Sequence, residues 1–353
     1  MYRNHNPKII NKHQEIKDKM NLEEKINKVK NALKDKKVLL AYSSGSDSTL
    51  LAHISSKVAE KTLLVTIDNG LFASDFIENV KSSTDNLKVE HEIININFHE
   101  NKKILENRSD RCYICRQLMY EKIKEIAQNK GYDYIIDGNN LSDLTLDRPG
   151  ILITYDNDFK TPLMDAGLTS KDIHEYLEKN NIPYHRNTTC LATRLKTNTP
   201  ITSDQIELTD RCEKIVKEAT DCQIVKVRNL DTSAIVEVDN ISKITSDNKY
   251  KEINDKLKSE GYKKVLLNLT QLEDTEEIVL DYEGGNFKYQ LPYTINIEKT
   301  IKNIKYIQYD EEKIKTEHTT IRKDGLIEGH DYKNYSQAYN DFTNILRKIR
   351  RIR

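Results

Sequence analysis

Residues 37–51 read KVLLAYSSGSDSTLL, an apolar run that leads through a loop of small and polar residues into a second apolar segment. The run at 38–41 is typical of a strand buried on both faces, and the segment after the loop has helical spacing. A strand, a small-residue loop and a helix in this order point backbone N–H groups and the positive end of a helix dipole at one place. The stretch therefore predicts a phosphate-binding loop. A serine-rich turn that binds nothing is the simpler alternative.

The composition describes a protein with a large solvated surface. The chain has 353 residues, of which 37% are hydrophobic and 32% charged, and its formal net charge is zero. This length suits about two domains, and the absence of net positive charge gives no global field for nucleic acid. No apolar run approaches the roughly 20 residues of a membrane span, and residues 1–20 lack the apolar core of a secretory signal. We expect a cytoplasmic protein without membrane contact, whose five cysteines serve metal binding or catalysis rather than disulfides.

Strands and helices alternate after the loop. Further strands are expected at residues 63–67, 89–94 and 134–136. This alternation predicts βαβ units in a parallel sheet and hence an α/β fold. Ligands of such sheets bind at the carboxyl ends of the strands. We therefore expect the loop at 43–48, Asp68 and Gly138 to lie at one site.

The pattern changes near Pro200. A helix with Ile206, Leu208 and Ile215, a helix around 250–260 and strands at 224–228, 234–238 and 264–269 predict a small α+β domain. The chain therefore divides into a flexible N-terminus (1–20), an α/β domain (21–199), the α+β domain (200–274) and a C-terminal extension of unknown role (275–353).

The extension carries weaker signals. Residues 278–291 have the pattern of a hairpin that turns at 283–285, where two glycines stand. The final ten letters, NILRKIRRIR, place isoleucine and leucine on one helical face and basic residues on the other. We interpret them as a terminal helix packed on the protein, with a contact to RNA or an acidic partner as the alternative.

Three cysteines form a second group of candidate site residues. Cys112 and Cys115 make a C-x-x-C, and Cys190 lies in TTCLATR. A tetrahedral zinc site needs a fourth ligand, for which His185 is the nearest candidate, although a structural or surface role is commoner for such a histidine. An iron–sulfur cluster normally takes four cysteines, so a cluster held by three leaves one iron open for a sulfur ligand. The count favours the cluster.

The loop SSGSDS at 43–48 resembles the PP-loop, SGGxDS, of the N-type ATP pyrophosphatases, whose fold is HUP-like and Rossmann-like. It is not a Walker A loop because no lysine stands at the required place. Ser44 replaces the family's first glycine. Because serine lacks the freedom of glycine at positive φ, we expect a slightly reshaped loop.

Several separate motifs resemble the LarE family of ATP-dependent sacrificial sulfur transferases: DGNN at 137–140, DRPG at 147–150, TPLMDAGLTSKDI at 161–173 and TTCLATRL at 188–195. The resemblance implies that ATP adenylates a carboxylate of a pyridinium biscarboxylic acid mononucleotide, that pyrophosphate leaves, and that sulfur is then delivered. It also implies the type that holds a 4Fe–4S cluster with three cysteines, a sulfur donor, and a homo-oligomer.

The same resemblance implies a role for each matching residue. Ser43, Ser44, Gly45, Ser46, Asp47 and Ser48, with Asp68 and Gly138, are expected to bind ATP. Asp47 is expected to bind Mg²⁺, and Arg194 a phosphate or the acyl-adenylate. Lys226, Arg228 and Glu237 are expected to line the substrate's phosphate site. Each residue also has a purely structural alternative. Asp47 could be a charge at a helix N-terminus, and Arg194 could be a surface charge. Lys226, Arg228 and Glu237 could be solvent-facing partners across two strands.

Two departures bear on the substrate. NLTQLE at 268–273 replaces a glycine- and arginine-rich ending, and the extension past 275 is foreign to the family. Two other functions therefore stay open. One is a PP-loop tRNA thiolase that uses the basic tail, and the other is a nucleotide-binding regulatory protein without chemistry.

Overall fold

The computed structural model describes residues 21–352 apart from 86, 149, 187–188 and 274–276. The predicted flexible N-terminus thus lies outside the described residues. Contacts divide the chain into two compact units. The larger unit comprises residues 28–140 and 149–276, and the smaller unit comprises 277–353, 141–148 and the chain up to Asn27. None of the described helices is long and apolar enough to cross a membrane.

A four-stranded sheet of order β3-β2-β1-β4 forms the centre of the larger unit. Its strands are β1 Lys37–Ala41, β2 Lys61–Asp68, β3 Glu90–Asn95 and β4 Tyr134–Ile136. All pairs are parallel, with Leu39 of β1 opposite both Leu63 and Ile135. Both faces of β1 are covered, which explains its unbroken apolar run. The predicted α/β fold with a parallel sheet is confirmed.

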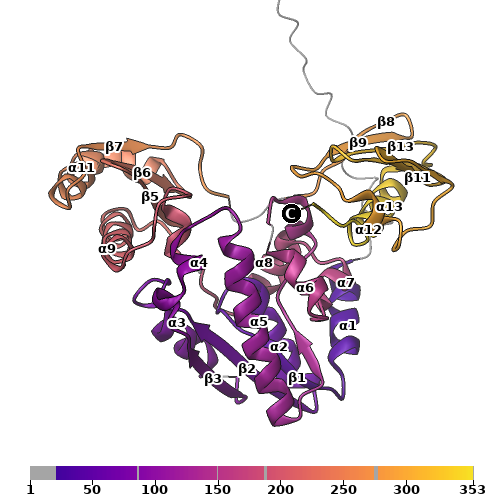
Figure 1. Cartoon of the computed structure of the whole chain (residues 1–353), viewed down its shortest axis with the longest axis horizontal. Helices are drawn as coiled ribbons and strands as arrows, with labels where there is room; N and C mark the ends of the chain where they lie inside the picture. The colour runs from indigo at the N-terminus through magenta and orange to yellow at the C-terminus, as the bar shows by residue number, and fades with distance from the viewer. Residues whose placement is uncertain (1–20, 86, 149, 187–188, 274–276, 353) are drawn as a thin grey trace, which may run out of the picture. The chain divides into compact units, whose positions relative to one another are not determined.

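Helices accompany these strands along the chain. They are α1 Leu22–Leu33, α2 Ser46–Val58, α3 Phe76–Thr84, α4 Lys102–Leu105, α5 Arg111–Lys130, α6 Ile151–Asp156, α7 Pro162–Ala166 and α8 Ser170–Lys179, with short 3₁₀ turns at Phe98–Glu100 and Leu191–Arg194. The 3₁₀ turn Ser142–Thr145 belongs to the smaller unit. Helix α5 lies along one face of the sheet (Figure 1), and its Ile123 and Ile126 belong to one buried cluster with Leu63 and Val65. Side-chain caps fix several helix starts. For example, Thr169 accepts a hydrogen bond from the Asp172 N–H and completes a capping box for α8.

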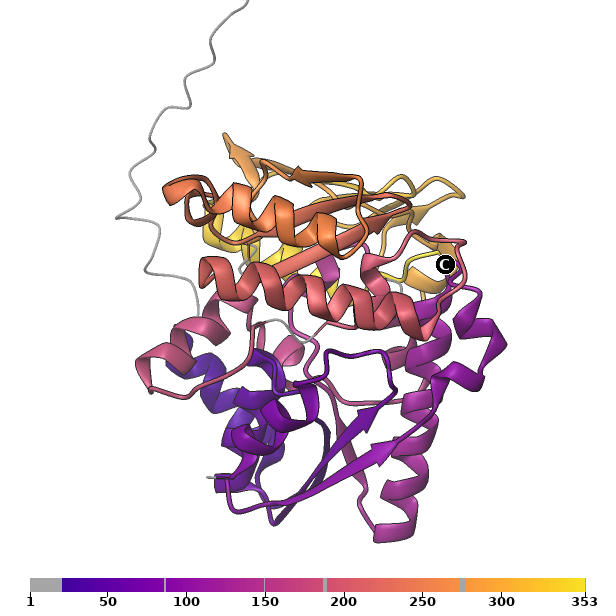
Figure 2. The ribbon, with the colours of Figure 1, turned by 90° about the vertical axis from the view of Figure 1, so that its left-hand side faces the viewer.

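The α+β part of the larger unit has a three-stranded sheet of order β5-β6-β7. Its elements are α9 Ser203–Thr220, β5 Val225–Leu230, β6 Ser233–Val238, α10 Ser242–Thr245, a 3₁₀ turn Ser246–Asn248, α11 Lys249–Ser259 and β7 Lys264–Leu267. Strands β5 and β6 are antiparallel, and β6 and β7 are parallel. Apolar residues of α9 and α11 pack together on the sheet (Figure 2). The predicted helices and strands are confirmed within a few residues, whereas a domain boundary at residue 200 stays a prediction.

The smaller unit is built on a six-stranded antiparallel sheet of order β10-β11-β12-β13-β9-β8. Its elements are β8 Asp281–Glu283, β9 Asn286–Gln290, α12 Ile297–Thr300, β10 Gln308–Tyr309, β11 Lys313–Lys315, β12 Thr319–Arg322, β13 Leu326–Gly329 and α13 Tyr335–Leu346. Gly284 and Gly285 at positive φ join β8 to β9, so the predicted hairpin is confirmed. The other strands were missed because they have four residues or fewer.

The predicted terminal helix is wrong in its extent. Helix α13 ends at Leu346, before most of the basic residues. The chain then forms a bridge between Arg351 and Ile295, and the Ile352 N–H donates to the Thr294 carbonyl at 2.9 Å. Strand-like pairing therefore satisfies backbone groups that a longer helix would have used. Ile352 is 42% exposed and does not belong to an apolar face.

Candidate functional site

The small-residue loop joins β1 to α2 and is held by its own side chains. The Ser43 N–H donates to Ser48 Oγ at 3.3 Å, and Ser48 Oγ donates to the Gly45 carbonyl at 3.2 Å. Gly45 is the N-cap of α2, and the Thr49 N–H makes the first helical bond, to Gly45, at 2.9 Å. The N–H groups of residues 46–48 therefore precede that bond, as the first turn of any helix requires. These N–H groups are available for an anion, and the predicted binding of phosphate stays a prediction.

Ser44 takes the conformation for which a glycine is normally required. Its φ is +60°, in the left-handed region that glycine adopts without steric cost. The slight reshaping of the loop stays a prediction. The residue is fully buried, and its hydroxyl lacks a hydrogen-bond partner among the residues described.

The end of β4 lies against the first turn of α2. A methyl group on Gly138 would come within 3.0 Å of Asp47 Cβ and 3.2 Å of the Ser48 nitrogen, so only glycine fits at 138 without a shift. Two residues later, Asn140 Nδ2 donates to Asp47 Oδ1 at 3.1 Å and to Ser170 Oγ at 3.2 Å. The structure thus brings Asp47 and Gly138 together and adds Asn140, which orients the Asp47 carboxylate.

A buried carboxylate anchors the 138–140 turn. Asp137 accepts hydrogen bonds from the Asn139 N–H at 3.0 Å and from Thr154 Oγ1 at 3.0 Å. Tyr120 also donates to it through a short contact, and Arg116 lies 3.2 Å away. Burial raises the pKa of the Tyr120 hydroxyl, so it stays a donor at neutral pH. This network fixes the turn that places Gly138 and Asn140.

The end of β2 contributes two side chains with different tasks. Asp68 Oδ1 accepts from the Gly70 N–H at 3.0 Å and closes the turn after the strand. Asn69 Oδ1 accepts from the Leu71 N–H at 3.0 Å, while its Nδ2 donates to Cys115 Sγ at 3.7 Å. The predicted ATP contact of Asp68 stays a prediction. Asn69, which sequence reasoning missed, connects this edge of the sheet with the cysteines.

The three predicted cysteines lie close enough for the charge of one to affect the pKa of another. Burial, with a smaller contribution from the charges of Cys190 and Cys112, raises the pKa of the Cys115 thiol to about 12. Burial also raises the pKa of Cys190, which a backbone hydrogen bond from Ala192 and the charge of Arg111 lower. Cys112 is exposed, and the other two thiols are partly covered. The thiols therefore form one group at the start of α5 and the 190 loop.

Arg111 is the cation of this group. Its Nη1 donates to the Ala192 carbonyl at 3.0 Å and to Asn107, and its Nη2 lies 3.5 Å from Cys112 Sγ. A guanidinium here stabilises thiolates, the form in which cysteine binds metals. Its position directly before the C-x-x-C was a signal that sequence reasoning did not use.

The spacing of the thiols bears on the kind of metal that they can hold. Two thiolates on one tetrahedral zinc ion lie about 3.8 Å apart, since each Zn–S bond is about 2.3 Å. Among the described residues, the three sulfur atoms do not gather within 4.8 Å of one another. Ligands of a cluster bind different irons and need a wider spacing. The described sulfur atoms are thus not gathered around a single ion site, and the predicted cluster stays a prediction.

Arg194 is buried rather than open to a ligand. Its side chain is 1% exposed, and its Nε donates to Glu213 Oε1 at 2.7 Å. Its Nη1 donates to Thr189 Oγ1 and Thr193 Oγ1, both at 2.7 Å, and to the Cys190 carbonyl at 3.2 Å. The predicted phosphate contact requires this buried pair to open. In the observed arrangement Arg194 shapes the loop that carries Cys190.

Two of the predicted substrate residues are also paired. Arg228 Nε donates to Glu237 Oε2 at 2.8 Å, and Arg228 Nη1 donates to the Thr193 carbonyl at 3.0 Å. Asn268 Nδ2 donates to Glu237 Oε1 at 3.2 Å. Lys226, opposite Glu237 in the ladder, has a pKa lowered by burial and by the charges of Arg194 and Arg228. β5 and β6 therefore bring positive charge to the 190 loop, while the binding roles stay predictions.

Known proteins share this combination of elements. A family model described as a PP-loop domain matches residues 18–146. An uncharacterized protein of Methanocaldococcus jannaschii is 32% identical over 244 residues, which cover 69% of this chain and 93% of that protein. The chain belongs to the PP-loop superfamily.

Further relatives place this PP-loop protein near the LarE family. A protein of Synechocystis, also uncharacterized, is 25% identical over 238 residues, or 66% of this chain and 88% of that protein. The pyridinium-3,5-bisthiocarboxylic acid mononucleotide synthase of Lactiplantibacillus plantarum is 23% identical over 191 residues, or 53% of this chain and 69% of the synthase. The LarE-like resemblance is thereby confirmed, and the protein is an ATP-utilising enzyme of the PP-loop type.

Proposed function

We propose that the protein is an ATP-dependent sulfur transferase that adenylates a substrate carboxylate, releases pyrophosphate and inserts sulfur from the site of Cys112, Cys115 and Cys190. Two hydrogen bonds support the proposal that ATP and the thiols share one site. Asn69, at the end of β2, donates to Cys115, and the His185 N–H, five residues before Cys190, donates to the Ser44 carbonyl of the loop at 3.0 Å.

Activation belongs to the loop and its neighbours. The N–H groups of residues 46–48 and the dipole of α2 would bind the pyrophosphate end of ATP. Asp47, oriented by Asn140, would hold Mg²⁺, which prefers carboxylate and phosphate oxygens. The ion would neutralise negative charge as pyrophosphate departs. The substrate carboxylate would attack the α-phosphorus, and the resulting acyl-adenylate makes AMP the leaving group for sulfur.

Sulfur delivery belongs to the cysteines. A 4Fe–4S cluster held by three cysteines would supply one iron without a protein ligand, on which the sulfur to be transferred can be carried. Arg111 and Asn69 would stabilise the ligating thiolates through charge and a hydrogen bond. The pairs of Arg194 and Arg228 hold the 190 loop through its Cys190 and Thr193 carbonyls.

The proposed substrate is a pyridinium biscarboxylic acid mononucleotide. The name of the Lactiplantibacillus relative supports this choice, and Lys226 and Arg228 supply positive charge for the nucleotide's phosphate. A cytoplasmic location, self-association and an unidentified sulfur donor complete the proposal. The tRNA thiolase alternative relies on positive charge in the basic tail. One of these charges is already used, because the Arg351 side chain is 9% exposed and paired with Asp147. A regulatory protein without chemistry would need neither the thiols nor Asp47.

An ATP–pyrophosphate exchange assay tests the substrate. Exchange should depend on the pyridinium biscarboxylic acid mononucleotide and not on bulk tRNA. Exchange with tRNA alone would overturn the substrate assignment, and exchange with neither would overturn adenylation of both.

Cysteine variants test the sulfur site. Cys190→Ala should keep exchange but form no thiocarboxylate, whereas the buried Cys222→Ala control should retain both. Anaerobic protein reconstituted with iron and sulfide should bind iron in wild type and lose it in Cys112→Ala. A wild type without iron after reconstitution would remove the cluster from the proposal. Loss of the elements of hydrogen sulfide from Cys190 after turnover would mark sacrificial delivery instead.

A further inference from the structure

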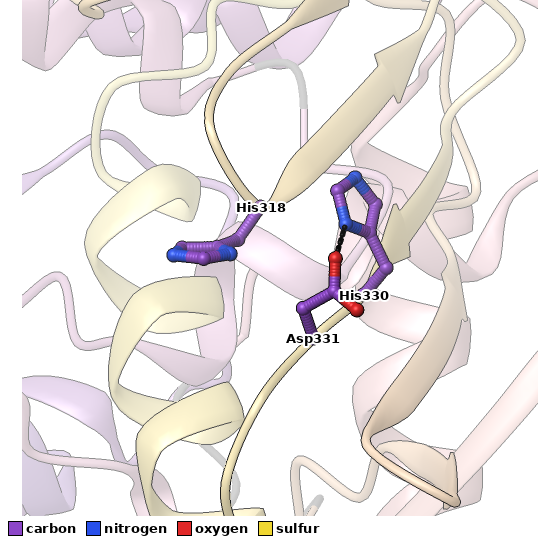
Figure 3. A group of neighbouring side chains, drawn as sticks. All are labelled: His318, His330 and Asp331. Atoms are coloured by element: carbon purple, nitrogen blue, oxygen red, sulfur yellow. Dashed lines mark hydrogen bonds and ion pairs between the residues drawn. The ribbon is translucent and has the colours of Figure 1, made fainter.

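Two histidines and an aspartate meet in the smaller unit, far in sequence from the cysteines and the loop. His318, His330 and Asp331 each offer one ligand atom, and these three atoms lie within 4.8 Å of one another (Figure 3). Among the described residues, no other group of three histidine, cysteine or carboxylate side chains has its ligand atoms within this distance. Neither the phosphate loop nor the proposed sulfur transfer uses it.

The β12–β13 ladder produces this meeting. Thr319 lies opposite Gly329 in the register, so His318 and His330 face each other one position further along. The His330 N–H donates to the His318 carbonyl at 2.9 Å and extends the ladder to this pair. Directly opposed residues project to the same face of a sheet. The two imidazoles therefore lie together because of the antiparallel pairing, which the sequence spacing alone did not reveal.

Asp331 completes the group through an unusual backbone conformation. Its φ is +62°, in the left-handed region, and its Oδ2 lies 3.0 Å from His330 Nδ1. Ligand bonds of about 2.0–2.2 Å place neighbouring N and O ligands of one ion about 3 Å apart. The observed separation already matches two ligands of one metal ion.

His318 supplies an atom with unused bonding capacity. Its Nδ1 is buried and lacks a hydrogen-bond partner among the described residues. A buried polar atom without a partner destabilises the protein. The side chain as a whole is 37% exposed, so its ring can turn to complete a site. Coordination to a metal would satisfy the nitrogen.

We propose that His318, His330 and Asp331 bind a divalent first-row transition-metal ion such as Zn²⁺. Neutral imidazole suits zinc, cobalt and nickel, whereas Mg²⁺ and Ca²⁺ prefer sites made of oxygen ligands. Three protein ligands leave at least one position for water or a small ligand, which is the pattern of an open site. His318 also lines a cavity of about 510 Å³ with Asn334, Asn340 and Asn344, which gives such a ligand room.

Zinc titration of the full chain tests the proposal. Because thiols in general can bind zinc, the background variant replaces Cys112, Cys115 and Cys190 with serine. Isothermal titration with Zn²⁺ should find one site in this background. Adding His318→Gln and His330→Gln should weaken that site by at least about 100-fold, since two of three ligands are lost. His53→Gln, a histidine of the larger unit, is the matched control and should change nothing.

Co²⁺ gives a second reading from the same variants. Visible d–d bands should appear in the serine background without sulfur charge-transfer bands and should disappear with the two histidines. Asp331→Asn preserves the preference for positive φ but removes the charge, so it should weaken zinc binding while metal-free melting stays unchanged. It also serves if the double histidine variant does not fold. Zinc binding that is absent from the serine background, or equal with and without the ligands, overturns the proposal.

Discussion

Two groups of proposed site residues in the larger unit differ in how their charges are compensated. On β5, β6 and the 190 loop, Arg194 pairs with Glu213 and Arg228 with Glu237, at 2.7 and 2.8 Å. At the edge of the parallel sheet, burial raises the pKa values of the Cys115 and Cys190 thiols, and Cys115 accepts a weak hydrogen bond from Asn69. Closed ion pairs build a frame, whereas thiols with a raised pKa stay protonated until a metal ion or cluster replaces their protons. The comparison assigns shaping to the first group and leaves the second group available for metal or cluster binding.

The largest expected effect concerns Asp47, the carboxylate of the reactive edge. Asp47→Ala should lower ATP–pyrophosphate exchange by about 1,000-fold, because a metal ion's charge stabilisation is worth several kcal/mol. Asp68→Ala is the matched control. Its carboxylate closes a turn by accepting from Gly70, so exchange should fall by less than about tenfold, comparable to one hydrogen bond. Equal losses in the two variants would place Asp68 in the metal site as well.

The next effect tests whether Arg194 belongs to the frame. Arg194→Met leaves Glu213 buried without its cation, which should cost about 3–5 kcal/mol of unfolding free energy in urea denaturation. Arg194→Met with Glu213→Leu removes both charges and should recover more than half of that loss. The Val227 N–H, which donates to Glu213, would still lose its acceptor. A stable Arg194→Met protein with a raised KM for ATP would instead make Arg194 a ligand-binding residue.

The sequence could predict the parallel sheet, the loop and the identity of the three cysteines. The unbroken apolar run, the cluster of small residues and the ordered motifs are local signals. The structure contains the strand and the loop that the first two predict. The sequence could not predict which charged side chains form ion pairs in the folded protein. Arg194 and Glu213 lie on separate elements, and their spacing in the sequence does not indicate a buried pair. The short strands of the smaller unit were missed for a related reason, since their hydrogen bonds join residues across turns rather than along a periodic run.

A third prediction concerns the protonation of Cys115 in the metal-free protein. With a pKa of about 12, its thiolate fraction grows tenfold for each pH unit below that value. Iodoacetamide labelling at Cys115 should therefore accelerate about 100-fold from pH 8 to pH 10, whereas an ordinary thiol of pKa about 8.5 accelerates only about fourfold. Mass spectrometry of the labelled peptide separates it from the exposed Cys112. Asn69→Ala removes a donor to the thiolate and should slow labelling of Cys115 at pH 8.

The smallest effect tests the loop itself, where frame and reactivity meet in one residue. Ser44 holds a left-handed φ of +60° and a buried hydroxyl without a partner among the described residues. Ser44→Gly relieves both costs and should stabilise the protein by about 1 kcal/mol, with exchange activity retained because the N–H groups of residues 46–48 keep their places. Ser44→Ala removes the hydroxyl but not the backbone cost, so urea denaturation of the two variants separates the contributions. If Ser44→Gly is stabilised but loses exchange, the serine hydroxyl takes part in binding ATP, and the buried polar atom belongs to the reactive group rather than to the frame.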